Sequence, residues 1–253
     1  ATVSYRSVGK QLAPLIVRTR GHRLEGMWHA GSPMGMILNS LKGMLVLTPR
    51  NMVQASGMYN TLMSCTDPAL IIEPLNAYRL KEKEPLNLGE FTVPLGKIEI
   101  INPGTDITVV SYGSTLKLVE KTIPELQRNN INIELIDIQS LIPFDLNKDI
   151  VESIKKTNKL LIVDEDYPGG ASSFILKVLI EDHNGFKYLD SKPITLTAKE
   201  HRTPYGSDGD YFSKPSIDDI FEACYRIMHE YNPKKYPTVS YTHLTLPTST
   251  HGW

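Results

Sequence analysis

The chain has 253 residues, of which 41% are hydrophobic and 22% charged, and its formal net charge is -1. This length and composition predict a globular protein with about one and a half to two domains. Charge so close to neutral, scattered along the chain, argues against nucleic acid or an anionic membrane as a partner, and no apolar run approaches the ~18 residues needed to cross a bilayer.

The first part of the sequence, residues 1–79, predicts strands that alternate with helices. In chain order, we expect a strand at 15–20, a helix at 34–41, a strand at 44–48, a helix at 51–64 and a strand at 69–73. Asn51 is expected to cap the second helix. The uninterrupted apolar run at 69–73 is typical of a parallel strand that is covered on both faces. The second helix places several apolar residues mostly on one face, which predicts core packing: Met52, Ala55, Met58, Leu62 and Met63.

Residues 80–93 lack apolar periodicity, and we expect an interdomain linker there with solvated charges. The alternation then restarts. We expect strands at 107–111, 131–138, 160–163 and 194–198, and helices at 114–128, 148–156, 171–181 and 217–231. Ser114, Asp145 and Ser216 are the expected helix caps, and Pro124 predicts a break or kink in its helix. Elements of these lengths predict an open, mainly parallel sheet with right-handed crossovers.

The cysteine content and the end of the chain carry two further predictions. Cys65 and Cys224 lie far apart among apolar neighbours, which predicts reduced, buried, structural thiols and a cytoplasmic protein. The stretch 239–248 resembles a translated sequencing adapter, so we expect residues 239–253 to be a non-native tail and leave them out of the fold.

The segment His29-Ala30-Gly31-Ser32-Pro33 lies between two apolar runs and carries the strongest candidate for chemistry. An imidazole titrates near neutrality, so it can exchange a proton and stabilise an oxyanion. Gly31 and Pro33 favour a fixed turn that presents the ring to a cleft. The residues alone leave a purely structural histidine open.

Several other polar residues permit both a functional and a structural interpretation. Three nearby arginines could steer an anionic substrate or form a solvated loop: Arg18, Arg20 and Arg23. Glu73 ends a buried strand and needs a partner, for which we expect Arg79 or nearby backbone; a catalytic carboxylate is the alternative. The glycines at 112–114 and 167–172 predict tight turns rather than phosphate sites. The acidic stretch 206–210 predicts a loop rather than a metal site.

Together with residues 15–18, 45–49 and 68–79, the His29 segment resembles the β subunit of the thiamine-diphosphate-dependent decarboxylating component of 2-oxo acid dehydrogenase complexes. The turn at 141–145 resembles one in the C-terminal domain that this family shares with transketolases, whereas 202–205 matches only partly. The resemblance implies an α/β fold. It places the C-terminal part of a pyrimidine-type thiamine diphosphate-binding domain at 1–79, a linker at 80–93 and a transketolase C-terminal-type domain with a mainly parallel sheet at 94–238.

The resemblance also implies a function. Such an oxidoreductase, of the pyruvate or branched-chain type, decarboxylates a 2-oxo acid on thiamine diphosphate and reductively acylates lipoamide within a multienzyme complex. His29 is the implied catalytic residue, although Ala30 and Gly31 replace the family's usual serine and glutamine. The implied cofactors are thiamine diphosphate and Mg²⁺, with ligands expected outside this fragment. Glu73 is not expected to be the glutamate that activates the cofactor.

The resemblance further implies that the chain is truncated at its N-terminus and is either a separate β subunit or the C-terminal half of a fused α–β polypeptide. The expected partners are an α subunit or α-like domain and the lipoyl acyltransferase core, in a homo- or hetero-oligomer. We expect the fragment alone to be inactive. Two alternatives remain open: a transketolase-like or deoxyxylulose-phosphate-synthase-like enzyme, and a non-catalytic subunit-docking module.

Overall fold

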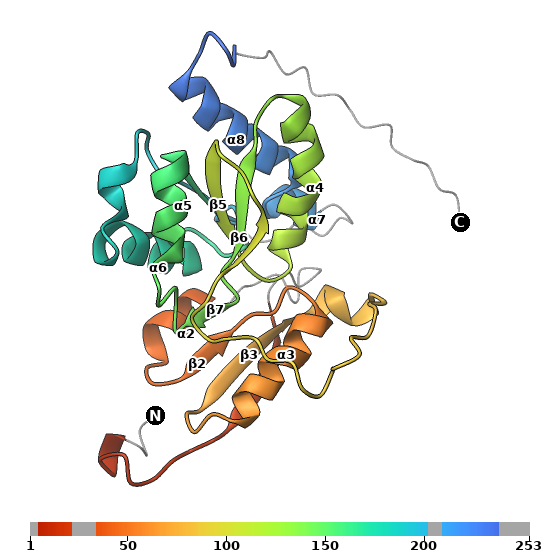
Figure 1. Cartoon of the computed structure of the whole chain (residues 1–253), viewed down its shortest axis with the longest axis vertical. Coiled ribbons are helices and arrows are strands. Elements are labelled where there is room, and N and C mark those ends of the chain that lie inside the picture. The colour runs from red at the N-terminus through yellow and green to blue at the C-terminus, as the bar shows by residue number, and fades with distance from the viewer. Residues whose placement is uncertain (1–4, 22–33, 202–208, 238–253) are drawn as a thin grey trace.

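The computed structural model describes residues 5–21, 34–201 and 209–237, and it contains two β-sheets with helices packed on their faces (Figure 1). The first sheet has four strands in the order β1-β3-β2-β7, and the second has five in the order β4-β6-β5-β8-β9. Apart from β4 and β7, every strand runs parallel to its neighbours. The predicted α/β fold with mainly parallel sheets is therefore confirmed.

The first sheet is built mostly from the N-terminal part of the chain. Its elements are β1 (Ile16–Gly21), α2 (Met34–Ser40), β2 (Leu45–Leu47), α3 (Met52–Met63), β3 (Ala69–Pro74), the 3-10 helix η1 (Leu75–Arg79) and β7 (Ser140–Ile142). Every residue of β3 is buried, as its apolar sequence predicts. Leu70 and Ile72 pack on the side of α2, whereas Ala69 and Ile71 pack on the side of α3. The strand is therefore covered on both faces.

The second sheet follows in the chain. Its elements are β4 (Glu99–Asn102), β5 (Ile107–Ser111), α4 (Thr115–Arg128), β6 (Ile133–Asp137), α5 (Asp149–Thr157), β8 (Leu160–Val163), α6 (Ala171–Lys177), the π-helix η2 (Val178–Asp182), the 3-10 helix η3 (Gly185–Tyr188), β9 (Ile194–Leu196), α7 (Gly209–Ser213) and α8 (Ile217–Tyr231). Helices α4 and α8 share a core with one face of the sheet. Helices α5 and α6 pack against the other face.

The helix caps confirm most of the predicted boundaries. The Asn51 side chain accepts a hydrogen bond from the backbone N–H of Gln54 at 2.8 Å. Ser216 and Asp219 form a reciprocal capping box at the start of α8. Asp145 accepts backbone N–H groups at the start of α5, although Lys148 is the residue that directly precedes the helix. Polar side chains near these ends therefore fix where the helices begin.

The structure departs from the expected helices and strands in three respects. Met63 is 77% exposed, because it lies one position beyond the buried stripe of α3. Pro124 does not break α4, which runs on to Arg128 while Leu126 and other apolar residues of the helix are packed in the core. The short strands β4 and β7 were not predicted. β7 pairs antiparallel with β2 and so joins the C-terminal part of the chain to the first sheet.

One continuous core connects the two sheets. It includes Met34 and Leu38 of α2, Ile72 of β3, and residues of the second sheet such as Val110 and Ile162. All five side chains are almost completely buried. Helix α2 also packs directly against α6. The two parts of the chain are therefore held together by apolar packing as well as by strand pairing.

The segment predicted as a linker is anchored to the first part of the chain. One carboxylate oxygen of Glu82 accepts hydrogen bonds from the backbone N–H groups of Met52 and Val53, at 3.0 and 3.1 Å. Gly57 leaves room for the Phe91 ring, because a Cβ atom at position 57 would come within 2.4 Å of it. The prediction of solvated charges was thus wrong for Glu82, which stabilises the first turn of α3.

The prediction of free, buried thiols is confirmed for Cys224 and only partly for Cys65. Both cysteines are free, and Cys224 is buried, but Cys65 is only partly buried, contrary to the prediction. Burial raises the pKa of the Cys224 thiol to about 12, so this sulfur is protonated and unreactive at neutral pH. No helix in the described part of the chain is long and apolar enough to span a membrane.

Candidate functional site

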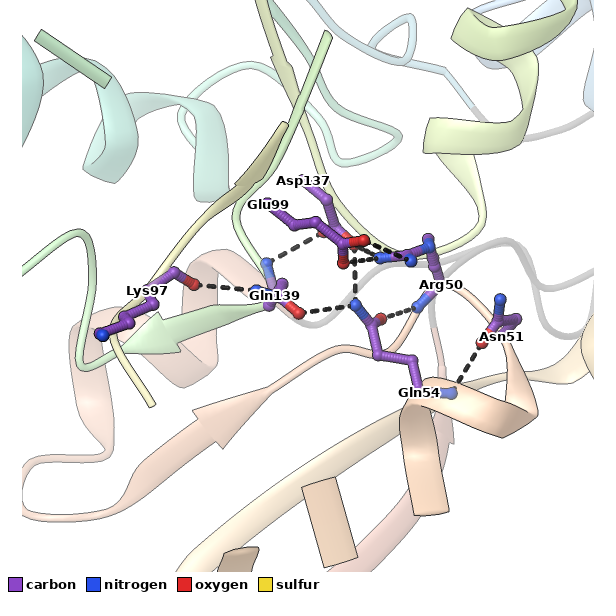
Figure 2. Close-up of polar contacts among 7 residues, drawn as sticks. All are labelled: Arg50, Asn51, Gln54, Lys97, Glu99, Asp137 and Gln139. Atoms are coloured by element: carbon purple, nitrogen blue, oxygen red, sulfur yellow. Dashed lines mark hydrogen bonds and ion pairs between the residues drawn. The ribbon is translucent and has the colours of Figure 1, made fainter. Parts of the chain in front are cut away.

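The carboxyl ends of parallel strands, where open α/β sheets usually bind ligands, meet between the two sheets. Arg50 follows β2, and Asp137 is the last residue of β6. The Arg50 guanidinium donates to the Asp137 carboxylate at 2.7 Å and to both carboxylate oxygens of Glu99 at 2.7 and 3.1 Å (Figure 2). The Asp137 side chain is fully buried. Arg50, Glu99 and Asp137 thus form a network of ion pairs, here called the Arg50 joint, which connects the second sheet to the segment between β2 and α3.

Two glutamines complete this joint. The Gln54 side-chain amide donates to Asp137 at 3.0 Å and to the Gln139 side-chain oxygen at 2.8 Å, and Gln139 in turn donates to the backbone carbonyl of Lys97 (Figure 2). Burial raises the pKa of Asp137, and the hydrogen bonds and charge of Arg50 and Gln54 offset only part of that effect. Because these groups bond to one another, the arrangement suits an orienting role better than proton transfer.

A second polar contact joins the start of α2 to the loop after β8. The Asp166 carboxylate accepts a hydrogen bond from the backbone N–H of Gly35 at 2.9 Å, and its other oxygen accepts from the N–H of Tyr167 at 2.9 Å. Asp166 is 4% exposed. Burial raises the pKa of Asp166, and these backbone hydrogen bonds counteract the effect.

Next to this contact lies a second buried carboxyl group, that of Asp164. Asp164 is fully buried and accepts from the Tyr112 hydroxyl at 2.6 Å, from the Ser172 N–H at 2.8 Å and from the Asp166 N–H at 3.1 Å. Burial raises the pKa of Asp164 to about 6. No sequence pattern had predicted a role for this residue. An aspartate directly after the apolar strand 160–163 and before two glycines was the available signal.

Glu73 lies at the carboxyl end of β3, and its partners differ from the prediction. It accepts hydrogen bonds from Tyr59 at 2.6 Å, from Arg18 at 2.8 Å and from Tyr78. Arg79 is not among these partners, because the Arg18 side chain on the neighbouring strand reaches the carboxylate instead. Burial would raise the pKa of Glu73, but the three hydrogen bonds outweigh it and lower the pKa. An ionised, fully engaged carboxylate cannot donate a proton near neutral pH.

The structure also tests the predicted arginine and glycine segments. Arg18 and Arg20 belong to the edge strand β1 rather than to a loop. Gly113 and Gly169 adopt positive φ angles of 57° and 89°, as expected for tight turns between strands and helices. Gly209 begins α7, so the end of the predicted acidic loop is helical.

The leading catalytic candidate, His29, lies outside the described residues, as do Arg23 and the stretch 202–205. The chain between β1 and α2 that carries His29 is flanked by Gly21 and Met34, which are both described. The described residues thus include the Arg50 joint, the Asp166 contact and the Glu73 cluster, whereas the role of His29 stays a prediction.

The described residues do not fit a complete thiamine diphosphate site. In this part of the chain, no three histidine, cysteine or acidic side chains are placed to hold a metal ion. A magnesium ion that bridges a diphosphate needs oxygen ligands of that kind. Glu73, the buried carboxylate near the carboxyl end of β3, is already held by three donors.

Comparisons with known proteins indicate the family to which the chain belongs. Residues 96–213 match the model of the transketolase C-terminal domain. The chain is 29% identical to the pyruvate dehydrogenase E1 component subunit beta of Acholeplasma laidlawii, over 87% of the chain and 66% of that protein. It is 32% identical to the protein of the same name from Mesostigma viride, over 89% of the chain and 68% of that protein.

Two further relatives extend the comparison. The acetoin:2,6-dichlorophenolindophenol oxidoreductase subunit beta of Bacillus subtilis is 28% identical over 91% of the chain and 66% of that protein. A solved structure titled split gene transketolase, inactive beta4 tetramer, shares the fold with a TM-score of 0.65 and 17% identity, over 83% of the chain and 65% of that structure. The chain thus spans about two thirds of the length of most of these relatives. By its sequence and its fold, the chain belongs to the family of pyruvate dehydrogenase E1 beta subunits and related 2-oxo acid dehydrogenase beta subunits.

Proposed function

We propose that this chain is the β part of an E1 component that decarboxylates a 2-oxo acid with thiamine diphosphate and reductively acylates lipoamide. The observation that carries the proposal is the likeness to E1 beta subunits over 87% to 89% of the chain. Thiamine diphosphate supplies the carbanion chemistry in such enzymes, and the protein supplies orientation and acid–base groups. The activity is proposed for the assembled component, not for this chain alone.

The proposal includes a division of the chain and a set of partners. Residues 1–79 form the C-terminal part of the pyrimidine-type domain, 80–93 the linker, 94–238 the transketolase C-terminal-type domain and 239–253 a non-native tail. An α subunit or α-like domain provides the Mg²⁺ and diphosphate ligands, and a lipoyl acyltransferase core receives the acyl group. The free thiols support a reducing, cytoplasmic location.

His29 is the residue proposed to act on the reacting groups. An imidazole can give or take a proton near neutral pH without a large shift in pKa. The flanking glycine and proline favour a turn that would present it at the carboxyl edge of the first sheet. The Glu73 cluster supports this assignment indirectly, because the buried carboxylate at the carboxyl end of β3 is ionised and occupied by its three donors and so does not offer a second acid.

Substitution of His29 in the assembled component tests the proposal. We expect His29→Ala to lower the turnover number for 2-oxo acid-dependent lipoamide acylation by about 10²-fold, in the usual range for loss of an acid–base group. His229→Ala, which removes an imidazole from α8, is the matched control and is expected to leave turnover unchanged. Equal activities of the two variants would refute the catalytic role of His29.

A substrate panel tests the reaction itself. The assembled component is offered pyruvate, branched 2-oxo acids, acetoin and ketose phosphates in separate assays. The acetoin arm is included because one relative is named for acetoin oxidation. We expect turnover with a 2-oxo acid. Turnover with ketose phosphates alone would favour the transketolase-like alternative, and retained activity of a complex without this chain would favour a docking module.

A further inference from the structure

Asp164 lies where the two parts of the chain meet. Its carboxylate accepts hydrogen bonds from the Tyr112 hydroxyl at 2.6 Å and from the Ser172 N–H at 2.8 Å, and both of these partners are almost completely buried. The Tyr112 ring and Ala171, the first residue of α6, pack in the same core cluster as Met34 of α2. Helix α2 therefore packs on the elements that bury Asp164.

A short chain of hydrogen bonds connects Asp164 to α2. The backbone N–H of Asp166 donates to the Asp164 carboxylate at 3.1 Å, and the Asp166 carboxylate accepts the N–H of Gly35, the second residue of α2, at 2.9 Å. The backbones are close here, because a Cβ atom at Gly35 would lie 3.0 Å from the Cα atom of Gly170. This meeting of α2 with the loop 164–170 is here called the α2 contact. Its separation would remove part of the packing that excludes water from Asp164.

Asp164 shares the α2 contact with other acidic groups. Burial raises the pKa of Asp164 to about 6, and the Asp166 carboxylate raises it further, whereas the Tyr112 hydroxyl stabilises the ionised form. Glu165, in the same loop, is also buried and acts on Tyr112. The sequence of α2 contains no charged residue, and α6 carries only Lys177, which lies in its last turn and bonds to Asp182. An ionised Asp164 thus adds a second negative charge beside that of Asp166.

We propose that the α2 contact is sensitive to pH, because release of a proton by Asp164 favours the separation of α2 from the loop 164–170. In the closed contact, burial favours the protonated carboxyl group. Separation hydrates Asp164, so its affinity for protons returns towards that of an exposed aspartate. By linkage, the contribution of Asp164 to the closed contact is fully present below about pH 4 and is lost as the pH rises through about 6.

Amide hydrogen exchange at Gly35, followed by NMR on the full 253-residue chain, tests the proposal. After correction for intrinsic exchange, we expect the opening equilibrium at Gly35 to rise by up to about 10-fold between about pH 5 and pH 7, because opening releases up to one proton. The Gln54 amide is the internal control, since it donates to the Asn51 side chain, which does not titrate. It should change clearly less. An equal rise at Gln54 would mean that the whole molecule opens, and would overturn the proposal.

Three variants identify the group that titrates. Asp164→Asn cannot release the proton, so the rise at Gly35 should fall below about twofold. Tyr112→Phe removes the hydroxyl that stabilises the ionised carboxylate, and should move the rise to higher pH; it also tests the proposal if Asp164→Asn does not fold. Asp145→Asn is the matched control. It changes another aspartate whose pKa burial raises and which accepts two backbone N–H groups, but at the start of α5, and should leave the rise at Gly35 unchanged.

These outcomes bear on the α2 contact alone, since no measurement involves the proposed reaction. A rise at Gly35 that persists in Asp164→Asn, or a rise that does not move to higher pH in Tyr112→Phe, would assign the titration to another group and overturn the proposal. Exchange at Gly35 that is independent of pH in the wild type would overturn it as well.

Discussion

Asp164 is a buried acid whose charge costs the folded protein stability above pH 6. Its pKa is raised to about 6 by burial, whereas an aspartate in an unfolded chain titrates near 3.9. Between these values the folded protein binds a proton that the unfolded chain releases, so the contribution of Asp164 to stability falls as the pH rises. The contribution is fully present below about pH 4 and is lost above about pH 6.

An Asp164→Asn variant cannot release this proton. We therefore expect the wild-type free energy of unfolding, minus that of the variant, to fall by about 2–3 kcal/mol between pH 4 and pH 8. Urea denaturation at a series of pH values measures the difference. Asp67→Asn makes the same chemical change at an exposed aspartate and is measured in parallel as the control. A pH dependence for Asp164→Asn no larger than that of Asp67→Asn would contradict the assignment.

The donors to Glu73 differ in how well water can replace them. Tyr59→Phe removes a hydroxyl from a carboxylate that is almost completely buried, and hydrogen bonds to charged groups contribute about 1.5–3 kcal/mol. We expect Tyr59→Phe to lower the free energy of unfolding at pH 7 by about 2 kcal/mol. Tyr78→Phe should cost less, because Tyr78 is 44% exposed and water can take its place. A larger loss at Tyr78, measured by chemical denaturation, would argue against this explanation.

At the scale of elements, Glu82 ties the segment 80–93 to the N-terminus of α3. Removing its carboxylate leaves the N–H groups of Met52 and Val53 without this acceptor. We expect Glu82→Ala to lower the free energy of unfolding by about 1 kcal/mol, as loss of a helix cap does. Limited proteolysis should also cut 80–93 faster. Glu84→Ala alters an exposed neighbour and should change neither property.

The sequence was sufficient for the elements that depend on local signals. Strands such as 107–111 and 160–163 were predicted at their observed bounds, because continuous apolar runs between turn residues specify buried parallel strands. The last helix, Ile217–Tyr231, was also predicted exactly, since its capping box lies within the sequence. These predictions succeeded because each element is specified by a strong pattern of residues that are close together in the sequence.

The remaining features depend on contacts between distant residues. β7 is only three residues long and exists because β2 lies beside it. Glu73 pairs with Arg18, which is 55 residues away in the sequence, and not with the nearby Arg79. The parallel pairing of β1 and β3 brings the Arg18 side chain next to Glu73. In the sequence, Asp164 and Asp166 are polar residues just before a predicted turn, and nothing there distinguishes them from exposed aspartates. Their burial, and therefore their perturbed pKa values, follow from tertiary packing.

At the scale of the whole molecule, Arg50 connects distant parts of the chain through its ion pairs with Glu99 and Asp137. Arg50→Ala would leave Asp137 fully buried without its guanidinium partner, and breaking such a pair typically costs about 3–5 kcal/mol. Arg50→Lys should recover only part of this, because an ammonium cannot match the forked geometry. Arg18→Ala is the control: Arg18 is 64% exposed, so water can replace much of its contribution and we expect a clearly smaller loss than for Arg50→Ala. Equal losses in the free energy of unfolding for Arg50→Ala and Arg18→Ala, measured with denaturant, would contradict this role of the Arg50 joint.

The shared core limits how this protein can be recombined with its relatives. Met34, Leu38 and Ile72 precede the segment 80–93 in the sequence, and they pack in one cluster with Val110 and Ile162, which follow it. The sequence of that segment suggests a suitable crossover point for a chimera. A chimera made there would nevertheless build this one cluster from residues of two different proteins. Exchangeable modules in this family would therefore have to carry α2 together with the second sheet, and the chain order alone does not mark that boundary.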